Sequence, residues 1–365
     1  MTTAQIRDVA LAAGAVACGV TDAEPFNDVR RDMERRMASG RAGSLGFTYR
    51  HPEIATDIRR SFEWATHLVV IATAYLPEAG SPGPREAGTG RVARFAASDH
   101  YRKLTFVLDA VATELRAHGH QAEELHDDDR LVDRAAAVRA GVGWWGKNSM
   151  VLTPGWGPWI LLGTVVTDAE LLLETPMKRT CGNCSACLPA CPTGALIEPG
   201  LLDATLCLAY WLQTAGSIPR HLRAAVGDRV YGCDDCLAAC PPGSGVLDMA
   251  SDSKGRIDLV DILASSDTEL EAEVGHWYVP KRDMDYVRRN ALVALGNSGD
   301  RDHVEIIAGW LGNGTAMMRG HAAWALGAIG GREAVRVLET AGTVEGDATV
   351  ATEITAALDA AATAR

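Results

Sequence analysis

The sequence predicts a chain in three parts: a mixed α/β (α+β) core, a cysteine-rich module and a C-terminal helical repeat. Three observations lead to this prediction. Helix-like and strand-like segments mix over residues 1–175, eight of the nine cysteines fall between residues 181 and 240, and an Ala/Leu pattern recurs near the C-terminus. The 365 residues are enough for about two or three domains with sizeable cores.

Composition and charge exclude several kinds of partner. The net charge is −12 and the isoelectric point is near 5.3, so the chain has no general attraction for nucleic acid or anionic membranes. An RNA partner therefore requires a local basic patch. No run approaches the roughly 20 apolar residues of a membrane span. Residues 1–20 lack a basic region and carry Asp8 within the apolar pattern, so we expect a cytoplasmic protein without a signal peptide.

In the first part, we expect strands in HLVVIATAYL (67–76) and in WILLGTVVTDAELLL (159–173), because both are long apolar runs. Glycine and proline are frequent in residues 77–90, which predicts a loop between elements.

The stretch GVGWWGKN (141–148) fits two nucleotide-binding patterns, G-x-G-x-x-G and G-x-x-x-x-G-K. A dinucleotide fingerprint follows a strand and opens a helix. Residues 130–140 instead have helical periodicity, so Gly141 is expected to end a helix. Two bulky tryptophans follow, and Asn148 stands where Ser or Thr would hold Mg²⁺. The sequence therefore disfavours both nucleotide-binding interpretations.

The cysteines follow the spacing of iron–sulfur ligands. Residues 181–192 form the ferredoxin run C-x₂-C-x₂-C-x₃-C-P, and residues 233–241 form a similar run that Cys207 completes. Zinc is the alternative, although zinc sites rarely use a three-cysteine run followed by x₃-Cys-Pro. The crossing of ligands in two-cluster ferredoxins assigns one 4Fe-4S cluster to Cys181, Cys184, Cys187 and Cys240, and the other to Cys191, Cys207, Cys233 and Cys236. We therefore expect a ferredoxin-like domain over 176–250. The ninth cysteine, Cys18, is expected to be an inert core residue.

A repeat occupies the C-terminal part. VRRNALVALGNSGD (287–300) aligns with MRGHAAWALGAIGG (318–331), and each segment places Ala and Leu on one helical face before a final glycine. Stacked helix pairs need this pattern, because each unit buries its face only against the next. Residues 351–358 are a candidate terminal unit. The alternative is two unrelated Ala-rich helices. We predict a connector over 251–279 and a helical repeat domain over 280–365.

Several segments together resemble one family. AGVGWWGKNSMVLTPGWGPWILLGTVVTDAEL, the cysteine block CGNCSACLPACPTGAL, LDATLCLAYWLQ, YGCDDCLAACP and RRNALVALGNSGD resemble the epoxyqueuosine reductases in order and spacing. The resemblance implies a cobalamin-dependent iron–sulfur enzyme, related in its core to reductive dehalogenases. Such an enzyme removes the epoxide oxygen of epoxyqueuosine in tRNA and so completes queuosine biosynthesis. It also implies a cobalamin-binding catalytic domain over 1–175 and a HEAT-like repeat.

The resemblance also assigns residues to the cobalamin. The segment of the form G-[LIV]-G-W-x-G-K-[NH] implies contacts from Trp145, Lys147 and Asn148, and a D-P-R-like element implies Arg59. The alternative for the tryptophans is an ordinary core role. The chain lacks Asp-x-His-x-x-Gly, so we expect no histidine ligand below the cobalt.

The proton donor is expected at Asp127. Residues 127–134, DDDRLVDR, end like the family segment D-[ST]-[GA]-P-L-[VL]-[DE]-R, which places Asp127 at the catalytic position. Asp128, Asp129 and Arg130 depart from that segment. Adjacent carboxylates raise one another's pKa, which favours a protonated donor, whereas Arg130 opposes it. The alternative is a solvated acidic turn.

The implied partners are the anticodon stem-loop of a tRNA and a ferredoxin or flavodoxin as electron donor, with no membrane. Candidate tRNA contacts are Lys281, Arg282, Arg288, Arg289 and Arg319. Residues 280–365 carry nine Lys and Arg against eleven Asp and Glu, which argues against tight RNA binding. The alternative function is therefore reduction or dehalogenation of a small molecule with the same cofactors. A non-catalytic electron carrier is less favoured, because a carrier does not need residues 1–175.

Overall fold

A computed structural model describes residues 1–76, 87–249 and 255–363. The chain divides into two compact units. Unit 1 comprises Met1–Ala79, Ser98–Thr205 and Asp234–Ser251, and unit 2 comprises Gly80–Ala97, Leu206–Cys233 and Asp252–Arg365. These units do not follow the boundaries predicted from the sequence, because the chain enters unit 2 three separate times.

Unit 1 is built on a four-stranded sheet. Its strands are β1 (Ala17–Asp22), β2 (His67–Ala74), β4 (Ala122–Leu125) and β7 (Ile160–Thr167). They lie in the order β1-β2-β7-β4, and every neighbouring pair is antiparallel. The two strands predicted from apolar runs are confirmed as β2 and β7, which form the centre of the sheet.

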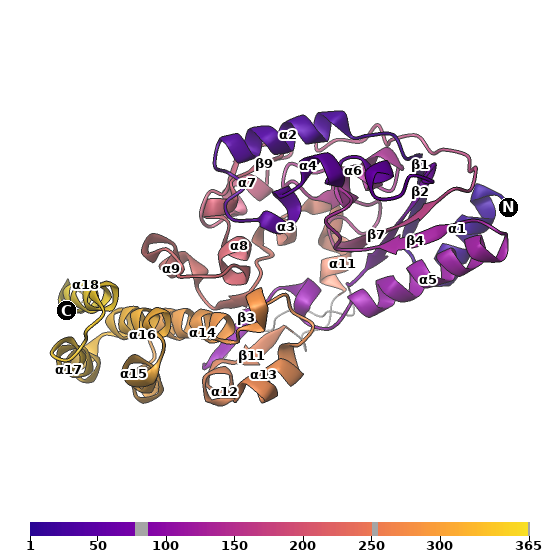
Figure 1. Ribbon diagram of the computed structural model, residues 1–365. Helices are drawn as coiled ribbons and strands as arrows, with labels where there is room; N and C mark the ends of the chain where they lie inside the picture. The colour runs from indigo at the N-terminus through magenta and orange to yellow at the C-terminus, as the bar shows by residue number, and fades with distance from the viewer. Residues whose placement is uncertain (77–86, 250–254, 364–365) are drawn as a thin grey trace. The chain divides into compact units, whose positions relative to one another are not determined.

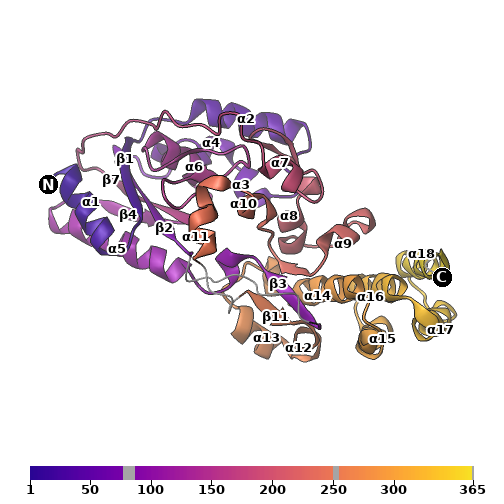
Figure 2. The same cartoon turned by 180° about the vertical axis from the view of Figure 1, so that it is seen from behind.

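Helices cover both faces of this sheet. Leu68, Val70 and Ala72 of β2 face one apolar cluster, whereas Val69 and Ile71 face another. This alternation follows from the two-residue period of a strand, and it explains why β2 is apolar throughout. The first cluster includes α6 (Asp133–Arg139), and the second includes α1 (Thr3–Ala12) and α5 (Tyr101–Ala117). Figures 1 and 2 show α5 and α6 on opposite faces.

Short elements complete unit 1. The remaining helices are α2 (Asn27–Ala38), α3 (Gly46–Tyr49), α4 (Pro52–Ala55), η1 (Ile58–Arg60), α7 (Cys187–Ala190), α10 (Asp235–Ala238), η4 (Pro241–Gly243) and α11 (Ser244–Asp248). Two hairpins pair β5 (Trp144–Trp145) with β6 (Val151–Leu152) and β8 (Leu196–Glu198) with β9 (Leu201–Leu202). Among the described helices of the whole chain, none has the length and hydropathy of a membrane span.

Unit 2 begins with a small sheet of β10 (Arg229–Tyr231), β3 (Thr89–Val92) and β11 (Arg256–Asp258). The chain passes from unit 1 to unit 2 within η3 (Ala204–Leu206). The shorter helices of unit 2 are η2 (Arg94–Ala96), α8 (Leu208–Gln213), α9 (Arg220–Val226), α12 (Leu259–Ala264), α13 (Asp267–Val274), η5 (Pro280–Arg282) and η6 (Arg301–His303). The predicted loop at 77–90 falls mostly outside the described residues and ends within β3. The segment predicted as a connector, 251–279, contains β11, α12 and α13. Its residues 251–254 lie outside the described part of the chain.

The C-terminal repeat is confirmed as five helices, α14 (Asp285–Ser298), α15 (Val304–Asn313), α16 (Ala316–Ile329), α17 (Gly331–Gly342) and α18 (Ala348–Thr363). Helices α14, α16 and α18 pack against one another in sequence order. In the two aligned segments, the glycines at equivalent positions, Gly296 and Gly327, make the closest of these contacts. A Cβ on Gly296 would lie 2.8 Å from the Cα of Ala325, and one on Gly327 would lie 2.7 Å from the Cα of Ala357. The repeated glycine therefore sets the close approach of successive helices.

Replacing Gly327 with alanine is expected to lower the free energy of unfolding by up to about 2 kcal/mol. The added methyl group meets backbone at a cost of about 1–3 kcal/mol, which exceeds the ~1 kcal/mol that alanine gains in helix propensity. Gly309→Ala in α15 is the matched control, because no atom lies within 4 Å of its added Cβ. Denaturant unfolding should show Gly309→Ala equal to or more stable than the parent. Equal stabilisation by both substitutions would contradict the packing argument.

Candidate active site

The GVGWWGKN segment forms a tight hairpin. Helix α6 ends before Gly141, whose φ is +70°, and the next residues form β5 rather than a helix. The turn is closed by a hydrogen bond from the Gly146 N–H to the Met150 carbonyl at 2.8 Å, and Asn148 Oδ1 accepts from the Met150 N–H at 3.2 Å. A helix before the glycines and a hairpin after them confirm that this is not a dinucleotide fingerprint.

This hairpin carries polar atoms without partners. Among the described residues, Trp144 Nε1 and Asn148 Nδ2 are buried donors with no hydrogen bond. Buried donors are costly when unpaired, so each is a place where a bound group could accept a hydrogen bond. Trp145 differs from Trp144, because it is 47% exposed and offers a large apolar surface to solvent. The two predicted tryptophans thus have different surroundings, and only Trp144 has a core position.

Four cysteines of unit 1 lie close together. Cys181 and Cys240 share an apolar cluster with Trp144 and Leu152, and Cys187 and Cys240 are both buried. Burial raises the pKa of the Cys240 thiol to about 12, and charges on Cys181, Cys187 and Cys184 add to the increase. Helix α7, which begins at Cys187, contacts helix α10, which ends just before Cys240, so the two cysteine runs meet there (Figure 2). These are the four residues that the sequence assigned to one cluster.

With the pKa of Cys240 and Cys187 raised, these thiols ionise together only when positive charge is bound among them. Iron–sulfur clusters are held by cysteine thiolates and supply that positive charge. The donor set is chemically suited to a polynuclear cluster with four thiolate ligands.

Lys147 connects the hairpin to the first cysteine loop. Its Nζ donates to the Gly182 carbonyl at 2.8 Å, one residue after Cys181. Burial raises the pKa of Cys187, and the positive charge of Lys147 acts against that increase. The ammonium group was predicted to approach the cobalamin, whereas in this structure it contacts the cysteine loop.

The other four cysteines are divided between the units. Cys191 and Cys236 belong to unit 1, and Cys207 and Cys233 belong to unit 2. Burial acts to raise the pKa of Cys191, but hydrogen bonds from Thr193, Leu196 and Ala195 outweigh it and lower the pKa overall. The Ala195 N–H lies 3.2 Å from the sulfur. Cys191 is therefore readily ionised, as a metal ligand must be.

Asp127 lies in the turn between β4 and α6, with a left-handed φ of +49°. Its residue surface is open to solvent, yet the surrounding protein raises the pKa of its carboxyl, chiefly by displacing water. The charge of Asp128 adds to this increase, while His126 opposes it. Asp128 in turn binds Arg130, with Nη2 2.6 Å from Oδ2 and Nε 2.8 Å from Oδ1. Arg130 therefore neutralises Asp128 and leaves Asp127 able to hold a proton.

The structure brings three further residues near this turn, Tyr101, His126 and Asp133, which the sequence did not single out as functional. Tyr101 and His126 have ring centroids 5.6 Å apart, and burial together with the charges of Asp127 and Asp133 raises the pKa of Tyr101. Asp133 is the first residue of α6, and its Oδ1 is a buried atom without a hydrogen bond. In the sequence, Asp133 belongs to the segment LVDR (131–134) that matches the family pattern, and nothing in that pattern indicates that its side chain is buried.

Arg59 is already paired in unit 1. Its Nη2 lies 2.8 Å from Glu24 Oε1, and its Nε donates to the Ala65 carbonyl at 3.3 Å. A cofactor contact from Arg59 therefore competes with an ion pair to Glu24.

The basic residues proposed for tRNA are mostly engaged within unit 2. The prediction of surface contacts is wrong for Arg288 and Arg289, because both side chains are buried, at 5% and 0% exposure. Arg289 donates to the carbonyls of Thr214 and Trp211, so it fastens α14 to the segment before α9. Arg282 binds Glu271 at 2.8 Å. Lys281 is exposed, with a positive φ.

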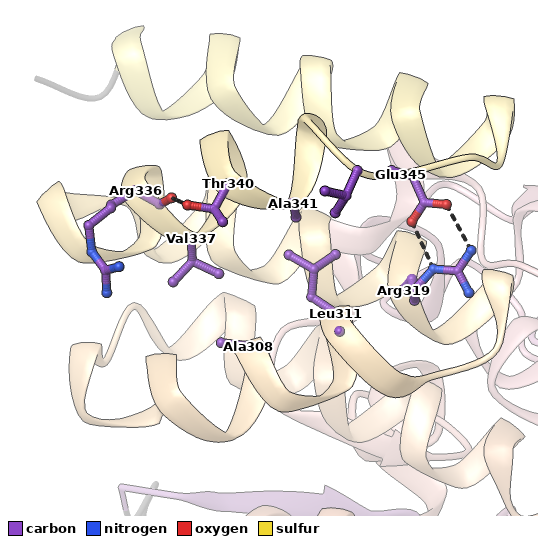
Figure 3. Close-up of a pocket in the computed structure, with 10 residues that line it drawn as sticks. Ala308, Leu311, Arg319, Arg336, Val337, Thr340, Ala341 and Glu345 are labelled. Atoms are coloured by element: carbon purple, nitrogen blue, oxygen red, sulfur yellow. Dashed lines mark hydrogen bonds and ion pairs between the residues drawn. The ribbon is translucent and has the colours of Figure 1, made fainter.

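Arg319 borders a cavity of about 490 Å³ in the repeat (Figure 3). Apolar side chains from α15 and α17 line this cavity, including Leu311 and Val337. The Arg319 guanidinium makes two hydrogen bonds to Glu345, at 2.8 and 2.9 Å. It therefore serves to hold the loop before α18 rather than being available to a phosphate.

Comparisons with known proteins identify the modules first. Residues 180–243 match the model of a 4Fe-4S double cluster binding domain, and residues 281–359 match that of HEAT repeats. The chain is therefore an iron–sulfur protein with a C-terminal helical repeat. This match favours iron–sulfur clusters over the zinc alternative.

Whole-chain relatives then give the family. An epoxyqueuosine reductase of Listeria monocytogenes is 31% identical over 93% of this chain and 92% of its own. Two solved epoxyqueuosine reductases cover 98% of both chains. One, with an epoxyqueuosine-modified tRNA stem loop, has a TM-score of 0.90 and 29% identity. The other, from Bacillus subtilis with its catalytic aspartate loop swung out of the active site, has a TM-score of 0.89 and 28% identity. The chain belongs to the epoxyqueuosine reductase family, which confirms the predicted resemblance and fold class.

Lys147→Met is expected to weaken retention of iron by the first cysteine group. The substitution removes the hydrogen bond to Gly182 and the positive charge that faces Cys187, at a cost of about 0.5–1.5 kcal/mol. Iron release to a chelator, followed by the cluster absorbance, should be a few-fold faster than in the parent. Lys178→Met is the control, since Lys178 is an exposed lysine of the same loop region. Equal rates for both variants would show that Lys147 does not support the loop.

Proposed function

We propose that this chain reduces the epoxide of epoxyqueuosine in tRNA to the alkene of queuosine. The observation that carries the proposal is the likeness to epoxyqueuosine reductases over nearly the whole length of both chains, including a solved relative with a modified tRNA stem loop. The relatives described above share this activity, which favours tRNA over the small-molecule alternative. A tRNA substrate also supports a cytoplasmic location.

The residues of unit 1 suit the two kinds of cofactor that this reaction implies. The cluster ligands are proposed to be the two cysteine sets predicted from the spacing. For cobalamin, the proposed contacts are the exposed ring of Trp145 and the unpaired donors Trp144 Nε1 and Asn148 Nδ2, because the corrin amides are hydrogen-bond acceptors. Arg59 and Lys147 remain candidate contacts, although both side chains already have protein partners. When bound, the clusters and the cobalamin supply the one-electron chemistry of low potential that the reduction needs.

Asp127 is proposed to supply the proton. It lies in a left-handed turn, and the ion pair between Asp128 and Arg130 keeps Arg130 from stabilising an Asp127 carboxylate. A protonated carboxyl near the epoxide oxygen would donate its proton as the C–O bond breaks. The solvated surface of Asp127 leaves it accessible to a substrate.

The remaining partners are proposed by class. An external ferredoxin or flavodoxin would supply the electrons. Of the five basic residues considered for the stem-loop, Lys281 keeps an exposed position, while Arg282 and Arg319 would first have to release Glu271 and Glu345. One lysine is not a basic patch, so binding of tRNA is expected to rely on surfaces beyond these five residues.

Asp127→Asn is expected to lower the rate of oxygen removal by about 100- to 10,000-fold, because the amide cannot donate a proton as an acid does. The holoenzyme, reconstituted anaerobically with iron, sulfide and cobalamin, would be given a chemical reductant and an epoxyqueuosine-modified stem-loop. Mass spectrometry would follow the loss of one oxygen atom. In the parent, the rate should fall as pH rises through the elevated pKa of Asp127, since only the protonated form is active.

Asp129→Asn is the matched control, since it removes an exposed carboxylate two residues away and is expected to keep the parent rate. If the fully loaded parent leaves the stem-loop unchanged, the proposed function is wrong. If Asp127→Asn is as fast as Asp129→Asn, the proposed acid is wrong and the function stands.

A further inference from the structure

A cavity of about 490 Å³ lies in unit 1 where α5 packs against β4 (Figure 1). Its wall on α5 consists of Tyr101, Arg102, Thr105, Phe106 and Asp109. On the opposite side the wall includes Glu124 of β4, three residues before Asp127. The cavity therefore opens near the turn that carries the proposed acid, and the reaction described above leaves it without a role.

The inner part of this wall is joined to that turn by direct contacts. Thr105 Oγ1 donates its only proton to the Tyr101 carbonyl, 3.0 Å away, so the same oxygen accepts from His126 Nε2–H at 3.2 Å. The His126 ring also lies against the ring of Tyr101, with 5.6 Å between the centroids. His126 directly precedes Asp127, so an occupant of the cavity lies next to the proposed acid.

The outer part of the wall is formed by two exposed side chains of α5. Phe106 is 63% exposed, whereas Leu104 and Leu108 on the opposite face of the helix are fully buried. The Arg102 side chain makes no hydrogen bond or ion pair within the described part of the chain. Arg102 and Phe106 are four residues apart on a helix, so their side chains are neighbours on one face. The cavity thus presents an apolar ring and an uncommitted cation side by side.

This pair of side chains is suited to a nucleotide. Proteins bind single-stranded RNA by stacking unpaired bases on aromatic rings, and the planar guanidinium of arginine binds phosphate oxygens. In the proposed substrate, the modified nucleotide is covalently linked to unpaired neighbours in the same loop. When the modified nucleotide reaches Asp127, a neighbour lies within reach of a cavity that adjoins Asp127.

The carboxylates at the cavity limit what can enter. Glu124 is paired with Arg116, 3.2 Å away, while Asp99 and Asp109 are exposed. A carboxylate repels phosphate, but it accepts hydrogen bonds from the amino group of a base or from a ribose hydroxyl. The cavity is therefore suited to a single nucleotide whose one phosphate lies at Arg102, and not to a run of phosphates.

We propose that this cavity is a subsite for a nucleotide adjoining the modified nucleotide of the tRNA loop. Phe106 stacks on the base of that nucleotide and Arg102 binds its phosphate, and together they hold the loop so that the modified nucleotide lies at Asp127. Phe106 and Arg102 are substrate-positioning residues and take no part in proton or electron transfer. This inference rests on the proposed function.

Binding of an epoxyqueuosine-modified stem-loop to the holoenzyme tests the stacking contact. Fluorescence anisotropy should show Phe106→Ala binding about 5- to 150-fold more weakly than the parent, because one base loses its stacking partner. Phe106→Trp retains an aromatic ring and should bind like the parent. Leu172→Ala is the matched control, since it removes an 80% exposed apolar side chain that does not line the cavity. Equal affinity of Phe106→Ala and Leu172→Ala would overturn the subsite.

The salt dependence of the same binding tests the phosphate contact. Loss of one phosphate contact in Arg102→Gln should reduce the slope of log Kd against log salt concentration by about 0.7, and Arg102→Lys should keep the slope of the parent. An unchanged slope in Arg102→Gln would remove Arg102 from the proposal.

Steady-state kinetics separate the subsite from the proposed function. Phe106→Ala should raise KM for the stem-loop more than it lowers kcat, as expected of a positioning contact distant from the reacting bond. If the parent neither binds nor reduces the stem-loop, the proposed function itself is wrong. If the parent reduces it and Phe106→Ala does so with the same KM, only the subsite is wrong. Slower reduction of Phe106→Ala by a ferredoxin, with unchanged stem-loop affinity, would assign the cavity to the electron donor instead.

Discussion

The convergence of four thiols in unit 1 is the constraint on which the surrounding structure depends. Cys181, Cys184, Cys187 and Cys240 affect one another's ionisation, and thiolates so close are stable only with cations among them. The neighbouring segments are arranged to hold this set. Trp144 packs into the same apolar cluster, and Lys147 binds the carbonyl of Gly182. The glycine-rich hairpin is therefore a support for the metal-binding loop, and its likeness to nucleotide motifs is incidental.

One short helix, α6, joins the acidic turn that carries Asp127 to the hairpin beside the cysteine loop. Helix α6 has seven residues, so it spans only about 10 Å. The acidic turn with Asp127 lies at its N-terminal end, and the hairpin follows its C-terminal end. The hydrogen bond from Arg134 to Ser149 fastens these ends to each other. The turn with the proposed acid and the hairpin beside the cysteine loop are thus both attached to α6, which packs against the central strands of the sheet.

Sequence reasoning succeeded where spacing alone carries the information. The cysteine runs predicted the double cluster domain, and the recurring Ala/Leu pattern predicted stacked helices. The structure adds that Gly296 and Gly327 occupy equivalent contacts between those helices. It failed where the partner is distant in sequence. Arg289 is a basic residue like Lys281, but its hydrogen bonds to Thr214 and Trp211 make it part of the core. The burial of Asp133 Oδ1 was also hidden, because burial of one oxygen atom is set by packing and leaves no periodic signal.

The most direct test of the account is the iron content and cluster spectrum of Cys240→Ala. Cys240 lies in a different cysteine run from Cys181, Cys184 and Cys187, yet the structure brings it to them. Anaerobically reconstituted Cys240→Ala should lose or convert one 4Fe-4S cluster and keep the other, as seen by iron analysis together with electron paramagnetic resonance of the reduced protein. Two intact four-iron clusters in this variant, with unchanged spectra, would contradict the assignment of the four thiols to one site.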